Sequence, residues 1–132
     1  MFRLLLPFVL LGLNACAQPD LPYDPDRLSS EPAVRIAATG TRGLALPNGA
    51  VIYVEDDLRT LSAYNAEDTL WQVDVGSSLL FITDSGDTII SGLEPSILKL
   101  MYDGRQLHIT FAKHCYGTVQ LSDGTLELNG CD

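Results

Sequence analysis

The stretch that decides the fold is LKLMYDGRQLHITFAKHCYGTVQLSDGTLELNGC, which runs from Leu98 to Cys131. It contains two Asp-Gly dipeptides, Asp103-Gly104 and Asp123-Gly124, each flanked by alternating apolar and polar residues. Asp-Gly suits the type I′ turn of a two-residue hairpin loop, in which both central residues need a positive φ. The stretch therefore predicts two β-hairpins in tandem.

The register of these hairpins agrees with the turn chemistry. Two-residue loops at the Asp-Gly dipeptides place Leu100 opposite Leu107 and Leu121 opposite Leu126. The next apolar pairs are Leu98 with Ile109 and Val119 with Leu128. Both hairpins therefore bury one consistent apolar face. The residues predicted on the opposite face are Lys99, Gln106, His108, Thr118, Gln120 and Glu127.

Upstream of the hairpins, the chain from Asn48-Gly49 onward reads as short apolar runs separated by turn residues. The runs are 51–55, 58–64, 70–75, 79–83, 88–91 and 96–102, and none has helical periodicity. We therefore predict an all-β single small domain of about nine short antiparallel strands in a meander, folded as a small barrel or a two-layer sandwich. The predicted core is Trp71, Phe81, Ile89, Leu98, Leu100, Leu107, Ile109, Phe111, Val119, Leu121, Leu126 and Leu128.

The chain opens with an export signal. Arg3 precedes an apolar run from Leu4 to Leu13, which is too short for a membrane-spanning helix and has the length of a signal-peptide core. Leu13-Asn14-Ala15-Cys16 follows, and this resembles the lipobox of bacterial lipoproteins. The resemblance implies a signal peptide over residues 1–15 and lipidation of Cys16. An ordinary secretory cleavage before Gln18, giving a secreted soluble protein, is the alternative.

The cysteine count fits lipidation. Three is an odd number of cysteines, so in an exported protein one of them would remain without a disulfide partner. A lipid on Cys16 leaves Cys115 and Cys131 as a pair. Export to an oxidising compartment predicts a disulfide between them. In the strict hairpin register, however, Cys131 faces Tyr116. The bridge therefore needs either a bulge or a strand that ends by Asn129-Gly130, and we predict the second.

We predict that residues 16–33 form a tether and that residues 34–132 form the all-β domain. The tether is rich in proline and acidic residues, a composition that favours an extended spacer reaching about 50 Å over a packed structure. Val34–Leu46 fits either a first strand or a loop that packs Leu44 and Leu46 against the domain.

The net charge of −9 limits the partners of the chain. An acidic protein is repelled by phosphate backbones, so we expect no nucleic-acid partner. Anionic lipid surfaces repel it for the same reason, and membrane attachment would come from the lipid anchor alone. Ala17 after the cysteine resembles the sorting pattern of outer-membrane lipoproteins, which implies the periplasmic side of the outer membrane in a Gram-negative host.

The candidate chemistry is sparse. His108 and His114 lack a set of metal ligands, so no metal and no cofactor are expected. The acidic pairs, such as Asp84 with Asp87, sit at turn positions, and no nucleophile motif is present. We therefore expect no catalytic residues and no enzyme activity. A small envelope hydrolase using exposed carboxylates is an alternative, as is a periplasmic protein analogous to lysozyme inhibitors, some of which have such small barrels.

The tyrosines could form a recognition surface, because tyrosine is enriched in interface cores. The candidates are Tyr53, Tyr64, Tyr102 and Tyr116, and coverage of sheet faces is the equally weighted alternative. The expected function is thus a lipid-anchored binding module, whose partner could be another envelope protein. TLSAYNAEDTLWQVDVG, from Thr60 to Gly76, is also similar to the repeat of pyrroloquinoline-quinone-type β-propellers, which implies four-stranded meanders and no quinone site.

Overall fold

The computed structural model describes residues 20–77 and 96–131, and in these ranges the chain is all-β, as predicted. The first element is a 3-10 turn, η1 (Pro25–Arg27). Five strands form sheet A: β1 (Leu28–Ser29), β3 (Gly43–Ala45), β4 (Ala50–Val54), β5 (Thr60–Asn65) and β6 (Asp68–Asp74). Five form sheet B: β2 (Ala33–Arg35), β7 (Ile97–Tyr102), β8 (Leu107–Phe111), β9 (Cys115–Val119) and β10 (Leu126–Cys131).

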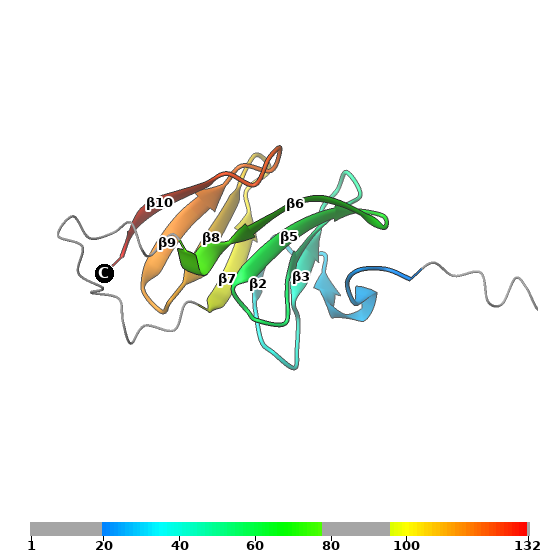
Figure 1. The fold of residues 1–132 in the computed structure, drawn as a ribbon, viewed down its shortest axis with the longest axis horizontal. Helices are drawn as coiled ribbons and strands as arrows, with labels where there is room; N and C mark the ends of the chain where they lie inside the picture. The colour runs from blue at the N-terminus through cyan, green and yellow to red at the C-terminus, as the bar shows by residue number, and fades with distance from the viewer. Residues whose placement is uncertain (1–19, 78–95, 132) are drawn as a thin grey trace, which may run out of the picture.

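The two sheets form a sandwich (Figure 1). The strand order is β1-β3-β4-β5-β6 in sheet A and β10-β9-β8-β7-β2 in sheet B. Each sheet is thus a four-stranded meander with one short strand from the N-terminal part of the chain at its edge. Neither sheet closes into a barrel within the described residues, so the sandwich is the observed alternative. The described residues contain no helix that is long and apolar enough to cross a membrane.

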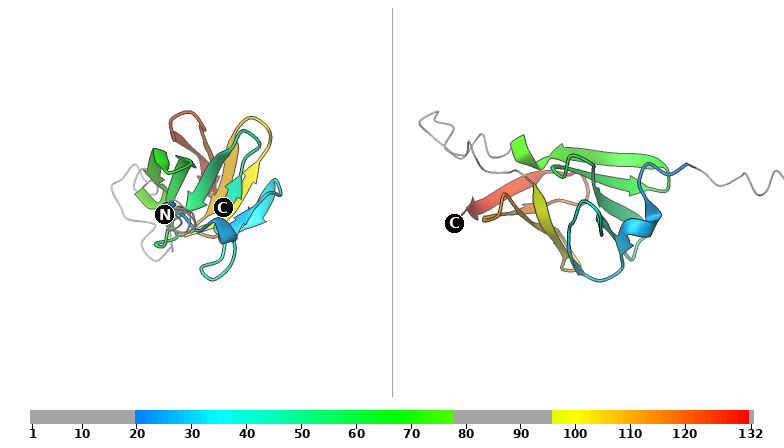
Figure 2. Two further views of the ribbon diagram at one scale, coloured as in Figure 1. Left: turned by 90° about the vertical axis from the view of Figure 1, so that its right-hand side faces the viewer. Right: turned by 90° about the horizontal axis from the view of Figure 1, so that it is seen from below.

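Figure 2 shows the two sheets from two further sides. The core lies between them and is made of buried residues from both sheets. The predicted core residues Trp71, Leu100, Leu107, Ile109, Phe111 and Val119 are buried, and Leu121, Leu126 and Leu128 pack against them half-buried. Leu98 was predicted in the core but is 37% exposed, because the pairing of β7 with β8 slips between Ile97 and Lys99 and turns Ile97 inward instead. The predicted runs 79–83 and 88–91, with Phe81 and Ile89, lie outside the described residues.

Both predicted hairpins form, but the predicted pairing is wrong by two residues. Leu100 pairs with Ile109, and Leu126 pairs with Val119. A shift of two residues leaves side chains on their predicted faces, because side-chain direction alternates with a period of two. The turn chemistry explains the first shift. The Asp103 carboxylate accepts hydrogen bonds from the amides of Arg105 and Gln106, so the reversal centres on Gly104-Arg105.

Trp71 of β6 links sheet A to the β9–β10 loop of sheet B. Its indole Nε1 donates a hydrogen bond of 2.8 Å to the carbonyl oxygen of Leu121. The ring also covers Gly124, where an added Cβ would lie 2.6 Å from the indole Cε3. Gly124 has a φ of 78°, so this position needs glycine both for its backbone and for the indole.

The prediction that residues 16–33 form an extended tether is wrong for the described part of that range. Tyr23 and Leu28 are half-buried against Val51, Tyr53 and Tyr64 on the outer face of sheet A. The backbone is also anchored, because β1 pairs with β3 and the amide of Arg42 donates to the carbonyl of Arg27 at 2.8 Å. We call residues 20–29 the N-terminal strap.

The stretch 34–46 contributes to both sheets. The strand β2 ends at Arg35, and β3 begins at Gly43 in the other sheet. Leu44 and Leu46 are buried in the core, but Leu44 lies in strand β3 and not in a loop, while Val34 packs against the core from β2. The strand alternative is thus correct at Val34, and the loop alternative is wrong at Leu44, which lies in a second strand.

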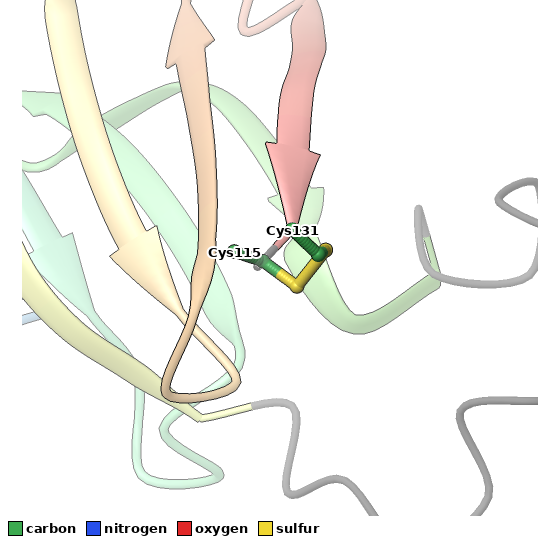
Figure 3. Close-up of a disulfide and its surroundings, with 2 residues drawn as sticks. All are labelled: Cys115 and Cys131. Atoms are coloured by element: carbon green, nitrogen blue, oxygen red, sulfur yellow. A yellow bond between two sulfur atoms is a disulfide. The ribbon is translucent and has the colours of Figure 1, made fainter.

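The Cys115–Cys131 disulfide is present, at the end of β10 (Figure 3). The prediction that β10 ends by Asn129-Gly130 is wrong, since the strand continues to Cys131. A register shift between Leu128 and Gly130 instead places Gly130 opposite Tyr116 and Cys131 opposite Cys115. The bulge, the other route, therefore brings the two cysteines face to face.

We predict that Gly124→Ala destabilises the protein more than Gly104→Ala. Both glycines have a positive φ, which costs alanine about 1–2 kcal/mol, but only Gly124 lies under the indole. The clash with Trp71 should add about 1–3 kcal/mol to the loss of unfolding free energy. Chemical unfolding of both variants measures the difference, and equal losses would contradict the role given to Trp71.

Reduction of the disulfide should lower the free energy of unfolding by about 3 kcal/mol, because the bridge closes a loop with a sequence separation of 16. Denaturant titrations with and without reductant measure this loss. A Cys115→Ala/Cys131→Ala variant is the control, and its stability should not respond to reductant. Two titratable thiols at these positions in the exported, unreduced protein would contradict the prediction.

Candidate binding surface

The four candidate tyrosines do not share one surface. Tyr53 and Tyr64 are 5% and 3% exposed on the outer face of sheet A, where Tyr23 of the strap covers them. The ring centroid of Tyr23 lies 5.9 Å from that of Tyr53 and 5.4 Å from that of Tyr64. These two tyrosines therefore hold the strap in place, which is the sheet-covering alternative.

Polar groups beside Tyr23, Tyr53 and Tyr64 form hydrogen bonds and a ring contact with two of these tyrosines and the neighbouring backbone. The Tyr64 hydroxyl donates a hydrogen bond to the Glu55 carboxylate, and burial together with this carboxylate raises the pKa of Tyr64. The guanidinium of Arg42 is buried, lies 5.7 Å from the Tyr53 ring centroid, and donates to the carbonyl of Val54 at 3.0 Å. The outer face of sheet A is thus already occupied by the chain itself.

Tyr102 lies at the opposite end of β7 from Ile97. It lines a groove of about 430 Å³ whose other walls are mainly apolar. The other lining residues are Ser30, Glu31, Pro32, Leu44, Ala45, Leu46 and Pro47. The amide of Tyr102 donates to the carbonyl of Pro32 at 2.8 Å, which ties the start of β2 to the end of β7. The groove lies where the strap's continuation crosses from one sheet to the other.

Tyr116 is the candidate tyrosine that lies on an open face. It is 43% exposed on the outer face of sheet B, next to a hollow of about 240 Å³. The hollow is lined by Lys99, Met101, His108, Ile109, Thr110, Tyr116, Gly117 and Asn129. Met101 is 38% exposed there. Cationic, hydroxyl, amide and apolar groups therefore meet on this face, and we take it as the candidate binding surface.

The sequence did not indicate which cation joins this surface. Arg35 of β2 stands directly opposite Lys99 of β7, although the two residues are far apart in the chain. Both side chains are exposed, while Val34, the residue before Arg35 in β2, packs against the core. The alternation of Val34 and Arg35 could have indicated the outward side of β2, but not its partner strand.

Several carboxylates of the described residues stabilise turns. Burial opposes ionisation of Asp57, but hydrogen bonds from the amides of Arg59 and Thr60 and the Thr60 hydroxyl lower its pKa overall. The pKa of Asp123 is lowered by the amide and the hydroxyl of Thr125. These acids behave as the turn-stabilising residues expected from sequence. Asp84 and Asp87, named for the hydrolase alternative, lie outside the described residues.

The histidines are not gathered into a metal site. His108 contacts the Asp103 carboxylate through Nε2 at 2.8 Å, and His114 lies exposed in the turn before β9. The cysteine next to it, Cys115, is bonded to Cys131. Across residues 20–77 and 96–131, no group of three His, Cys, Asp or Glu side chains is placed to hold a metal ion.

Asp103 predicts an acid-sensitive stability. Hydrogen bonds from the Gln106 amide, His108 and the Arg105 amide lower the pKa of this carboxyl well below its usual range. The ionised form therefore stabilises the fold above about pH 4, and this contribution is lost as the pH falls toward the folded-state pKa. The melting-temperature difference between the wild type and Asp103→Asn should be largest near neutral pH and narrow toward pH 2. Parallel profiles would contradict it.

Comparisons with known proteins do not assign the chain to a family. No family model matches the chain, and neither a curated protein nor a solved structure matches it. The function of this chain is therefore inferred from its own residues.

Proposed function

We propose that this protein is a lipid-anchored, non-catalytic binding module of the bacterial cell envelope. The observation that carries the proposal is the distribution of the cysteines. Cys115 and Cys131 pair with each other in the fold, which leaves Cys16, at the end of the apolar leader, as the third cysteine. A cysteine at that position resembles the lipidated residue of bacterial lipoproteins, and the pairing of the other two suits an exported protein.

The strap modifies what such an anchor would do. Tyr23 already packs on sheet A, and Asp20 is the first described residue. The chain from Cys16 to Asp20 reaches at most about 14 Å, at about 3.5 Å per residue. A lipid on Cys16 would therefore hold the domain close to the membrane while the strap stays packed, in place of the 50 Å spacer expected from composition.

Binding is favoured over catalysis by where the polar groups lie. The carboxylates of Asp57, Asp103 and Asp123 are bonded to turn amides, and Asp74 is held by Arg59 at 2.9 Å. The outer face of sheet B, in contrast, presents exposed Met101, Tyr116 and cations beside a shallow hollow. Such a mixture is typical of a protein-binding surface, and another envelope protein is the proposed partner class.

Cys16→Ala should abolish lipid labelling of the chain expressed in a Gram-negative host. Metabolic labelling with a clickable palmitate analogue, followed by separation of membrane and soluble fractions, measures the effect. The wild type should be labelled and found with the outer membrane. The matched control is Cys115→Ala/Cys131→Ala, which removes the other two cysteines and should retain the label.

The N-terminus of the mature protein distinguishes the two export routes. Mass spectrometry of the wild type should find a lipidated Cys16 as the first residue. An unmodified first residue at Gln18 in the soluble fraction would show the secretory alternative, and an intact Met1 with three free thiols would overturn the export proposal as a whole.

A further inference from the structure

We infer that the outer face of sheet B is a docking surface for an acidic segment of a partner protein. The inference deepens the proposed function, since it names the chemistry that the binding module would recognise. The residues that carry it are Arg35, Lys99, Thr110 and Tyr116, which we call the cationic row.

The cationic row crosses four neighbouring strands of sheet B. Arg35 pairs with Lys99, Lys99 with Thr110, and Thr110 with Tyr116. Neighbouring strands lie about 4.8 Å apart, so the row extends over about 14 Å. Two positive charges therefore stand at one end of the row, and two hydroxyl groups at the other.

Neither Arg35 nor Lys99 forms an ion pair with a carboxylate of residues 20–77 and 96–131. Arg27, Arg42 and Arg59 form ion pairs with Asp24, Asp56 and Asp74. Arg35 and Lys99 therefore differ from these three arginines. Two other cations of the described residues, Arg105 and Lys113, also form no ion pair, but they lie in turns and not on the face of the sheet.

Like charges directly opposite on neighbouring strands destabilise a sheet. In a chain of net charge −9, Arg35 and Lys99 thus form a local positive site whose repulsion an external carboxylate would relieve.

The hollow beside the row fits a side chain better than a large ligand. Its volume of about 240 Å³ lies below the range of about 300–1,000 Å³ that is usual for small-molecule sites. Met101 and Tyr116, exposed at its rim, belong with arginine to the residue types enriched in protein interfaces. Lys99 lines the hollow, so a carboxylate side chain entering it would lie next to an ammonium group.

The position of the strap favours a protein over the membrane as the partner. The strap packs on the outer face of sheet A, and the cationic row lies on the outer face of sheet B, on the other side of the core. The chain leading from a lipid on Cys16 would enter the domain at sheet A. The cationic row would then be directed away from the anchoring membrane and toward other envelope proteins.

The test is fluorescence anisotropy of a labelled oligo-glutamate peptide, titrated with the full chain. A peptide of about ten residues is long enough to cover the row, at about 3.3 Å per residue. Arg35→Gln/Lys99→Gln should weaken binding about tenfold, and added salt should weaken wild-type binding. Arg105→Gln/Lys113→Gln is the matched control, because it also removes two charges, both from turns of the same sheet, and it should change binding by less than about twofold.

Stability separates a lost contact from a lost fold. Arg35→Gln should unfold at the same temperature as the wild type or higher, because it removes the repulsion with Lys99. Tyr116→Ala, with a melting temperature near that of the wild type, should also bind more weakly. A drop in binding only for variants that are unfolded would overturn the inference.

The remaining outcomes decide the partner class. Equal weakening by Arg105→Gln/Lys113→Gln, or no binding of the peptide, would overturn the docking surface. Binding of polygalacturonate or polyphosphate as tight as that of the peptide would show a general anion site and overturn the protein partner. Because Cys16→Ala does not touch sheet B, peptide binding without palmitate labelling would defeat only the anchor, and labelling without peptide binding only this inference.

Discussion

The contact between Trp71 and the β9–β10 loop is the constraint that fixes how the two sheets meet. A sandwich of two open meanders has few backbone bonds between its layers, so side chains must set their relative position. Trp71 makes two contacts with this loop. Its ring packs over Gly124, and its Nε1 donates a hydrogen bond to the carbonyl oxygen of Leu121. An indole on the edge strand of sheet A is thereby held by a loop of sheet B. The loop, in turn, can adopt this shape only with a glycine at position 124.

Local sequence signals predicted the two hairpins and the faces of their residues. They did not predict which strands pair when the strands are far apart in the chain. Alternation gave the correct faces for Leu100, Leu107, Ile109 and Val119, because the face of a residue depends only on its parity. The register was wrong by two residues because the Asp103 side chain captured the amides of Arg105 and Gln106, a contact that a dipeptide rule does not include. The pairing of β2 with β7 brings together residues far apart in the chain. No local pattern predicts such a pairing, and the cationic row depends on it.

The strap shows how a sequence of disordered composition can fold onto a prepared surface. Its prolines and acids supply little apolar area, but Pro25 fits the first turn of η1 and Asp24 accepts the amide of Asp26. Tyr23 and Leu28 then find an apolar patch that sheet A would otherwise expose at Val51, Tyr53 and Tyr64. Composition measures what a segment can bury by itself. It does not include the surface that the rest of the chain offers, which is why two of the candidate tyrosines became part of the strap's binding site.

The charges of the domain are divided between structural and unsatisfied groups. Acids outnumber bases, and those at Asp57, Asp103 and Asp123 hold turns by accepting backbone amides. With that excess of carboxylates, every cation could have a partner within the chain. The strand order instead sets Arg35 beside Lys99, where neither reaches a carboxylate of the described residues. A sheet tolerates such a pair at a modest loss of stability. Because of this repulsion, the energy of the row falls when a negative group arrives from outside, and this links the pairing of β2 with β7 to recognition.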